Sequence, residues 1–336
     1  MKEAAIVILN YNGEAMLQKY LPQVISNSVY DIVVIDNGSN DGSISYLQRD
    51  FPEIRLVLLS ENHGYSKGYN LGLKELKDAY SFYLLLNSDV EVSDGWDQTL
   101  VGYLLQNPKV AACQPKVLSL KKKGYFDYAG AAGGFLDQLG YPFCRGRILH
   151  LLEEDQGQYD DSIEVDWASG ACFCVKSAVF HDLGGFNPFY FSHMEEIDLC
   201  WRMRNKGYKI HHCGATSVYH LGGGTLSQVN PLKTYLNFRN SLYMLKGNLE
   251  LIGFIKVLIL RMILDAGAFM HLLLTKGVPH SWAIIRAYRD FVINRDALRY
   301  RQSQKVKKHT SAKPLAVYCI IWSYYLKGKK KYSEMN

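Results

Sequence analysis

The chain has 336 residues, of which 48% are hydrophobic and 21% are charged. This composition excludes a disordered chain, and the length suits one large domain or one domain with an appendage. The net charge of +6 hides an asymmetry: residues 246–336 carry 17 Lys and Arg against 5 Asp and Glu, a net of +12, and the remaining residues carry 21 against 27, a net of −6. An acidic front and a basic tail indicate two tasks, and the tail is suited to an anionic surface of phospholipid or nucleic acid.

The start of the chain and its cysteines favour a cytosolic protein. Met1 leads within a few residues into a strand-like segment, and no signal peptide is visible. The seven cysteines lack the paired spacing of a zinc site, and we interpret them as buried thiols. Cys172 and Cys174 have the period of two that places both thiols on one side of a strand.

The front of the chain alternates between two patterns. Short apolar runs typical of strands lie at residues 5–10, 31–36, 54–59, 82–87 and 110–115. Helical patterns lie between them near residues 14–26, 65–78 and 95–106. Together they predict a Rossmann-like α/β fold with a mostly parallel sheet covered on both faces. We expect residues 121–164 to be irregular and a boundary near residue 247, which separates domain 1–247 from a helical region 248–336.

Three of the predicted strands end on polar residues. The clusters are Asn10-Tyr11-Asn12, Asp36-Asn37-Gly38-Ser39 and Asn87-Ser88-Asp89. Because parallel strands bring their carboxyl ends to the same edge, and ligands of such sheets bind there, we expect these clusters to meet at a ligand site.

The acidic residues of these clusters each have a structural and a functional interpretation. Asp36 fits an Asx-turn, but it also fits a carboxylate that accepts a hydrogen bond from N3–H of uracil or thymine, which cytosine lacks. Asp89 fits a helix cap or turn, but it also fits an oxygen ligand of a divalent cation that holds a diphosphate.

Two later segments carry further candidates. In "SHMEEIDLCWR", Ser192 and Glu195 have the spacing of a capping box, and Glu196 and Asp198 would then lie in the first turn of a helix. Capping does not explain the adjacent Glu195–Glu196 pair, which could include a general base. His220 ends a strand before three glycines; a lone histidine is more often structural, yet the glycines would let the backbone approach a ligand.

In their order and spacing these motifs resemble the inverting family-2 glycosyltransferases of GT-A fold, and most strongly the rhamnosyltransferase-like branch. The resemblance covers roughly residues 4–245 and includes "VILNYN", "VIDNGSNDGS", "LLNSDVEV", "HMEEIDLCWR" and "SVYHLGG". It implies metal-dependent transfer of a sugar from a nucleotide-sugar to a hydroxyl of a glycan acceptor, with a lipid-linked acceptor in cell-surface polysaccharide synthesis.

The resemblance also implies a role for each matching residue. Tyr11 packs on the nucleotide base, Asp36 binds the pyrimidine, Asp89 and His220 hold the metal, and Glu196 is the base. The segment "NHGYSKGYNLGL" resembles the family's helix start near the diphosphate, and Lys67 lies within this segment. Asn87, Glu195 and Asp198 complete the substrate-binding set. The donor is a UDP- or dTDP-sugar, with dTDP-rhamnose among the candidates, and the cofactor is Mn²⁺ or Mg²⁺.

The chain departs from the family pattern at two positions. Asn87 stands at the first position of the D-x-D motif and gives the cation one charge less, although its amide can still bond a ribose hydroxyl. Glu196 stands where the family has Asp and is one methylene longer. An isolated Glu is a weak base, so the mechanism needs burial and the neighbouring Glu195 or Asp198 to raise the pKa of Glu196.

The tail has the composition of a membrane-associating region. In residues 249–276 the charges interrupt every long apolar run, and Glu250, Arg261, Asp265 and Lys276 fall within an arc of about 80° on a helix. This favours a helix that lies on a membrane over one that crosses it; the alternative is a helix packed on the domain. Aromatic residues in 315–326 followed by a polybasic run at 327–331 suit the inner face of the cell membrane.

Three other functions are alternatives to sugar transfer. A nucleotidyltransferase or NAD enzyme is disfavoured because Gly64, Gly68 and Gly72 have the wrong spacing for a dinucleotide fingerprint. A membrane-docked protein that binds a nucleotide-sugar without catalysis is conceivable because Asn87 is neutral. Nucleic-acid binding is disfavoured because the tail's aromatic residues do not interleave with Lys and Arg. The sequence does not determine the sugar, UDP against dTDP, the acceptor or linkage, the oligomeric state, or whether the C-terminal helices pack on the domain or on the membrane.

Overall fold

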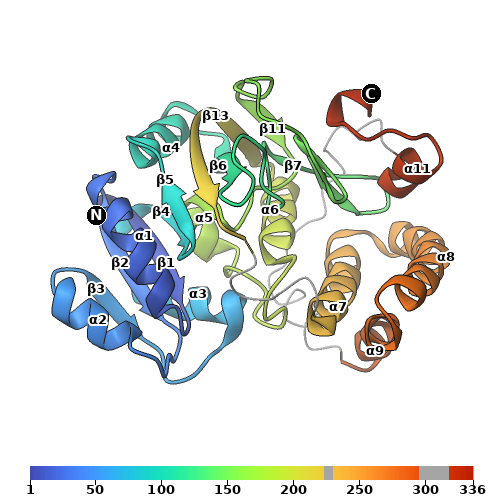
Figure 1. The fold of residues 1–336 in the computed structure, drawn as a ribbon, viewed down its shortest axis with the longest axis horizontal. Helices are drawn as coiled ribbons and strands as arrows, with labels where there is room; N and C mark the ends of the chain where they lie inside the picture. Colours follow the sequence, from blue (N-terminus) through green and yellow to red (C-terminus); the bar gives the residue numbers. More distant parts are fainter. Residues whose placement is uncertain (223–229, 295–317, 336) are drawn as a thin grey trace.

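A computed structural model describes residues 1–222, 230–294 and 318–335, and its main feature is a mixed sheet with helices on both faces (Figure 1). Among the described residues nine strands form this sheet: β1 (Lys2–Asn10), β2 (Asp31–Asp36), β3 (Arg55–Leu58), β4 (Tyr80–Asn87), β5 (Val90–Val92), β6 (Val110–Ser119), β11 (Ile163–Val165), β12 (Cys172–Lys176) and β13 (Lys209–His220). A smaller sheet contains β7 (Gly134–Leu136), β8 (Pro142–Cys144), β9 (Arg147–Ile148) and β10 (Leu151–Leu152).

The helices follow the same chain order. They are α1 (Glu14–Ser26), α2 (Ser43–Asp50), α3 (Gly64–Lys74), α4 (Trp96–Gln106), α5 (Ser177–Asp182), α6 (Glu195–Asn205), α7 (Pro231–Asn248), α8 (Leu251–Thr275), α9 (Val278–Ile293), α11 (Ile320–Tyr325) and the short 3₁₀ helix η1 (Tyr332–Glu334). In Figure 1, α7, α8 and α9 gather at one end of the molecule, away from β1–β3.

The central strands are apolar throughout because both of their faces are covered. On β1, Ala5 and Val7 belong to one core and Ile6 and Ile8 to the other. Tyr69 of α3 packs in the first core, and helices α1 and α4 supply residues to the second. This two-sided burial accounts for the continuous apolar runs, in place of the alternation of a half-exposed strand.

The predicted parallel arrangement of the first strands is confirmed. β1 pairs in parallel with β2 and with β4, so Asn10 lies opposite Asp36 and Leu9 lies opposite Asn87. The rest of the sheet is mixed, because β12 runs antiparallel to both β4 and β6. Cys172 and Cys174 lie in the same core, and all seven cysteines are buried and free.

Two expectations about the fold were wrong. Residues 121–164 are not irregular, since they contain the small sheet β7–β10; its strands have only two or three residues, too few to show a period in the sequence. Helix α2 (Ser43–Asp50) was not expected, and its eight residues contain a single buried face formed by Ser43, Tyr46 and Leu47.

The C-terminal helices pack on the protein through one face. Within α8, Arg261 and Asp265 are buried, and Asp265 accepts hydrogen bonds from Tyr141 (2.9 Å) and Tyr288 (2.7 Å). By length and composition α8 is sufficient to cross a membrane, the one such helix among the described residues. Arg261 and Asp265 nevertheless face the protein, whereas many of the apolar residues of α8 face outward: Leu251, Ile252, Ile255, Ile259, Met262, Ile263, Met270 and Leu274 are exposed.

The last described segment packs beside the small sheet, next to the end of β7. Ile320 of α11 is buried, and its backbone N–H donates to Asp137 at 2.8 Å. Residues 315–317 of the predicted aromatic segment lie outside the described residues, whereas Tyr318, Trp322 and Tyr325 are exposed.

Candidate active site

The polar ends of β1 and β2 are joined by the Asp36 side chain. Asp36 is fully buried; one carboxylate oxygen accepts a hydrogen bond from the Asn10 amide at 3.0 Å and the other from the Ser39 backbone N–H at 2.8 Å. Asp36 thus lies at the predicted edge of the sheet, but its carboxylate is hydrogen-bonded to the loop that follows β2. Of the two interpretations of Asp36, the turn is observed, and base recognition stays a prediction.

Tyr11 and Lys67 are accessible at the same end of the sheet. Tyr11 directly follows β1 and is 44% exposed, so its ring is free to stack on a flat ligand. Lys67 is exposed on α3, whose Ser66 and Gly68 are buried.

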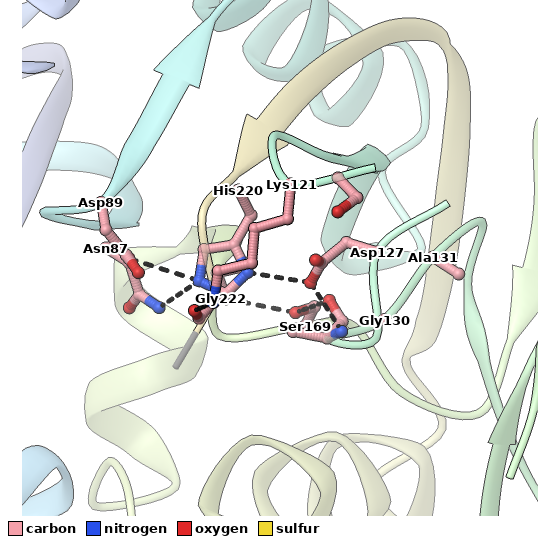
Figure 2. Close-up of polar contacts among 12 residues, drawn as sticks. Asn87, Asp89, Lys121, Asp127, Gly130, Ala131, Ser169, His220 and Gly222 are labelled. Carbon is pink, nitrogen blue, oxygen red and sulfur yellow. Dashed lines mark hydrogen bonds and ion pairs between the residues drawn. The ribbon is translucent and has the colours of Figure 1, made fainter. Parts of the chain in front are cut away.

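His220 lies between two carboxylates, as Figure 2 shows. Its Nε2 is 3.3 Å from Asp89 Oδ1, and its Nδ1 is 2.9 Å from Asp127 Oδ1. Asn87 approaches the same Nε2 at 3.5 Å. All three charged side chains are buried to more than nine-tenths, so their charges act in a medium of low dielectric constant.

Strand pairing produces this cluster. β5 pairs antiparallel with the end of β13, which places Val90 opposite His220 and therefore Asp89 beside the imidazole. Asp127 lies in the connection after β6, and its backbone N–H donates to Val117 of that strand at 2.8 Å. Asp127 was not predicted from the sequence, because no local motif relates it to a histidine 93 residues later.

The two carboxylates set the protonation of His220. Burial alone would lower the pKa of His220, but the hydrogen bonds to Asp127 and Asp89 outweigh it and raise that pKa to about 9. The His220 ring in return keeps the pKa of Asp89 below its ordinary value against the effect of burial. The two carboxylates thus favour the protonated form of the His220 ring.

A divalent cation fits this donor set in part. Among the described residues no group of three or more His, Cys, Asp or Glu side chains is arranged to hold a metal. Asp89 and His220 Nε2 nevertheless face one another, and Asp127 fixes the other ring nitrogen as a carboxylate does behind many metal-bound histidines. Mg²⁺ and similar ions commonly take one or two protein ligands and complete their shell with phosphate and water. The residues therefore fit a cation that is bound together with a diphosphate.

Glu195 and Glu196 form a second acidic group at the start of α6. Glu195 is 4% exposed, and on both residues the Oε2 atom is buried without a hydrogen-bond partner. Burial raises the pKa of both carboxyls, and the charge of Glu196 raises that of Glu195 further. Burial thus shifts Glu196 in the direction that a general base at neutral pH requires.

Gly170 connects the acid pair to the end of β4. Asn87 donates its backbone N–H to Ala171 at 3.1 Å, and the neighbouring Gly170 carbonyl accepts from the Tyr65 hydroxyl at 3.1 Å. A Cβ on Gly170 would lie 2.7 Å from the Tyr65 oxygen and 3.5 Å from Glu196, so a side chain there would clash with the Tyr65 hydroxyl and contact Glu196.

The expected capping box at α6 is wrong. Glu195 is the first helical residue, the N-cap is Met194, and the Ser192 hydroxyl has no partner. The reason lies in the backbone: Phe191, His193 and Met194 all have positive φ, a conformation that non-glycine residues avoid and that clusters at functional sites. This turn directs Ser192 away from the N–H groups that it was expected to cap.

Helix α7 holds the strained turn in place. The amide of Asn240, fully buried on α7, donates to the backbone carbonyls of Tyr190 (3.0 Å), Ser192 (2.9 Å) and His193 (2.8 Å). Arg239 donates to the carbonyl of Phe189 at 3.0 Å. Sequence reasoning missed Asn240, since only the tertiary packing of α7 on α6 brings it to the turn.

Asp198 has a structural role in place of the expected substrate contact. It is fully buried, and its two oxygens accept from Arg202 Nε and Asn248, each at 2.9 Å. The first-turn position was predicted correctly, but the side chain faces the interior. A buried ion pair of this kind costs about 3–5 kcal/mol when one partner is removed.

The fold is the GT-A fold, as the solved structures also indicate. GalNAc-T7, crystallised with UDP, GalNAc and Mn²⁺, superposes with a TM-score of 0.58 at 16% identity, over 73% of this chain and 48% of that one. Residues 5–154 match the family described as Glycosyl transferase family 2. The chain thus contains a family-2 glycosyltransferase domain, and the resemblance drawn from the sequence motifs is confirmed.

Curated relatives agree with this family. The low-salt glycan biosynthesis hexosyltransferase Agl10 of Haloferax volcanii is 25% identical over 71% of this chain and 74% of its own length. The N-acetylglucosaminyl-diphospho-decaprenol L-rhamnosyltransferase of Mycobacterium tuberculosis is 23% identical over 64% of this chain and 75% of its own. The chain is therefore related to a hexosyltransferase of glycan biosynthesis and to an L-rhamnosyltransferase.

Proposed function

We propose that this protein transfers a sugar from a UDP- or dTDP-sugar to a hydroxyl of a lipid-linked glycan, with inversion at the anomeric carbon. The observation that carries the proposal is the convergence of Asp89, His220 and the Glu195–Glu196 pair on the edge where β1, β2 and β4 end. dTDP-rhamnose is one candidate donor, because a relative's name specifies L-rhamnose and a diphospho-decaprenol acceptor. Residues 1–247 form the catalytic domain in this proposal, and residues 248–336 form the membrane-associated region.

The donor is bound by residues at the strand ends. Tyr11 stacks on the base, Asp36 selects a pyrimidine with an N3–H, Asn87 bonds the ribose, and Lys67 approaches the diphosphate. Wild-type protein should bind UDP or dTDP more tightly than CDP, and Asp36→Ala should weaken that binding by about 1–3 kcal/mol. Equal affinity for CDP would refute the assignment of Asp36.

Asp89 and His220 would hold Mn²⁺ or Mg²⁺. Such a cation neutralises charge on the leaving diphosphate. His220 is oriented for this task by Asp127, which bonds the far side of its ring. Asp89→Ala should remove most metal-dependent turnover, and His220→Ala should change the metal preference. Full activity in excess chelator would refute metal dependence.

Glu196 takes the proton from the attacking hydroxyl. It is the less buried of the two glutamates, its Oε2 is unpaired, and its raised pKa suits proton uptake near neutral pH. Glu195 lies deeper and contributes to the shape and charge of the acceptor site.

The C-terminal helices place the enzyme on the inner face of the cell membrane. The support is the outward apolar face of α8 together with the tail's net charge of +12 over residues 246–336. High salt or carbonate should release the protein from anionic vesicles, whereas extraction by detergent alone would indicate a spanning helix.

A donor screen by nucleotide release tests the whole proposal. Purified protein with Mn²⁺ is offered UDP-, dTDP-, GDP- and CDP-sugars with a membrane lipid extract as acceptor, and free nucleotide is measured. Turnover of a UDP- or dTDP-sugar alone is expected. Binding without turnover of any donor would favour the alternative, a non-catalytic nucleotide-sugar binding protein.

A further inference from the structure

A cavity lies between α7 and α9, away from the strand ends. Its volume is about 280 Å³, at the small end of ligand pockets, so it suits a segment of a chain better than a whole sugar nucleotide. It is lined by Pro231, Leu232, Tyr235, Pro279, Trp282, Ala283 and Arg286.

The chemistry of this lining favours an apolar occupant. The Tyr235 hydroxyl is engaged with Asp290 at 2.8 Å and with Arg239 at 3.2 Å, so it is not available to a sugar hydroxyl. Trp282 is 58% exposed and lies in one stripe of α9 with the exposed Val278 and Ile285, at the i, i+4, i+7 spacing of a helix face. An apolar stripe on the helix surface therefore leads into the cavity.

Two lysines stand beside the cavity without a counter-charge. Lys233 follows the lining residue Leu232, and its Nζ is 5.9 Å from the ring of Tyr128, the residue after Asp127. Burial and the charge of Lys276 lower the pKa of Lys233, and the charge of Lys233 contributes to the lowered pKa of His193 in the strained turn. Neither lysine forms an ion pair within residues 1–222, 230–294 and 318–335. Both lysines thus lie close in the chain to residues that line the cavity, and the charge of Lys233 also acts on the turn that precedes Glu195.

We propose that the α7–α9 cavity and these lysines bind the carrier of the acceptor: an isoprenoid chain lies against Trp282 and Leu232, and its phosphate or diphosphate is bound by Lys233 and Lys276. The inference rests on the proposed function, in which the acceptor is lipid-linked. This carrier site would explain the position of α7 and α9, because a carrier bound in the cavity between them directs the attached sugar past His193 toward Glu196.

Farnesyl diphosphate serves as the probe, titrated calorimetrically into the full chain at saturating UDP so that the donor's diphosphate position is filled. Wild-type protein should bind it at least about tenfold more tightly than farnesol, which lacks the diphosphate, or inorganic diphosphate, which lacks the isoprenoid chain. Lys233→Gln should weaken farnesyl diphosphate binding about tenfold and leave farnesol binding unchanged. Trp282→Ala should weaken both. Lys256→Gln, an exposed lysine on α8, is the matched control and should change neither.

The outcomes separate this inference from the proposed function. If UDP and dTDP do not bind, the proposed function fails. If UDP binds but Lys233→Gln, with an unchanged melting temperature, binds farnesyl diphosphate as the wild type does, the carrier site is refuted. Competition by soluble dihexanoyl phosphatidylglycerol at equal strength would also overturn it, because the site would then bind a membrane phospholipid.

Discussion

The exchange of Glu196 for Gln is the most direct test of the catalytic assignment. The two side chains have the same shape, and the Glu196 Oε2 atom has no hydrogen-bond partner that an amide would lose. The fold, donor binding and metal binding should therefore survive. Loss of a general base lowers turnover by about 10²–10⁴, equivalent to about 3–5 kcal/mol in the activation barrier.

The pH profile adds a second, independent readout. A base must be deprotonated, and burial raises the pKa of Glu196 above the ordinary 4.5. Wild-type kcat/KM should accordingly fall as pH is lowered through this raised pKa, and the residual rate of Glu196→Gln should lack that acidic limb. Glu196→Asp should retain the limb at a lower rate, because its carboxylate is one methylene shorter.

The assay is a single-turnover measurement at saturating donor, so that weaker binding is not mistaken for slower chemistry. Glu195→Gln is the matched control, with the same substitution one residue earlier, where the side chain points about 100° away on the helix. It should cost much less in rate. An inactive Glu195→Gln beside a near-normal Glu196→Gln would show that the motif has been assigned one residue out of register.

Three further predictions concern the supports of the site. Asp127→Asn should weaken Mn²⁺ binding about 10–100-fold, measured by titration with UDP present, because His220 loses the carboxylate that orients it; unchanged affinity would exclude the metal assignment of His220. Asn240→Ala removes the hydrogen bonds that its amide donates to the carbonyls of Tyr190, Ser192 and His193, so it should lower the melting temperature by several degrees and kcat more than it raises KM; an unchanged kcat would mean that the turn is held without Asn240. Glu195→Gln should stabilise the protein toward urea at pH 8 but not at pH 4. The pKa of Glu195 is raised in the native protein, so the wild type has its full stability below the pKa of the unfolded chain. It loses about 1.4 kcal/mol for each unit of that pKa shift as the pH rises through the native pKa. Equal effects at both pH values would contradict a buried Glu195 carboxyl with a raised pKa.

The structure also changes the physical explanation of several sequence motifs. Ser192 and Glu195 have the spacing of a capping box, yet three residues with positive φ prevent the capping. Asp198 lies in the first turn as predicted, but Arg202 and Asn248 take up both of its oxygens in the interior. Capping and first-turn preferences are weak local effects of about 1 kcal/mol, so a packed interface overrides them.

By itself the sequence determined the parallel strands β1, β2 and β4 and the residues at their ends. Continuous apolar runs and the turns that follow them are local features, and the edge at which parallel strands deliver their last residues follows from their direction alone. Only the tertiary structure decided that His220 lies between Asp89 and Asp127, that Asp36 is buried beneath its own loop, and that Asn240 fixes the turn before Glu195. The contacts of His220 with Asp127 and of Asn240 with His193 join residues 93 and 47 positions apart, and their partners are selected by strand register and helix packing, which no short segment of the chain encodes.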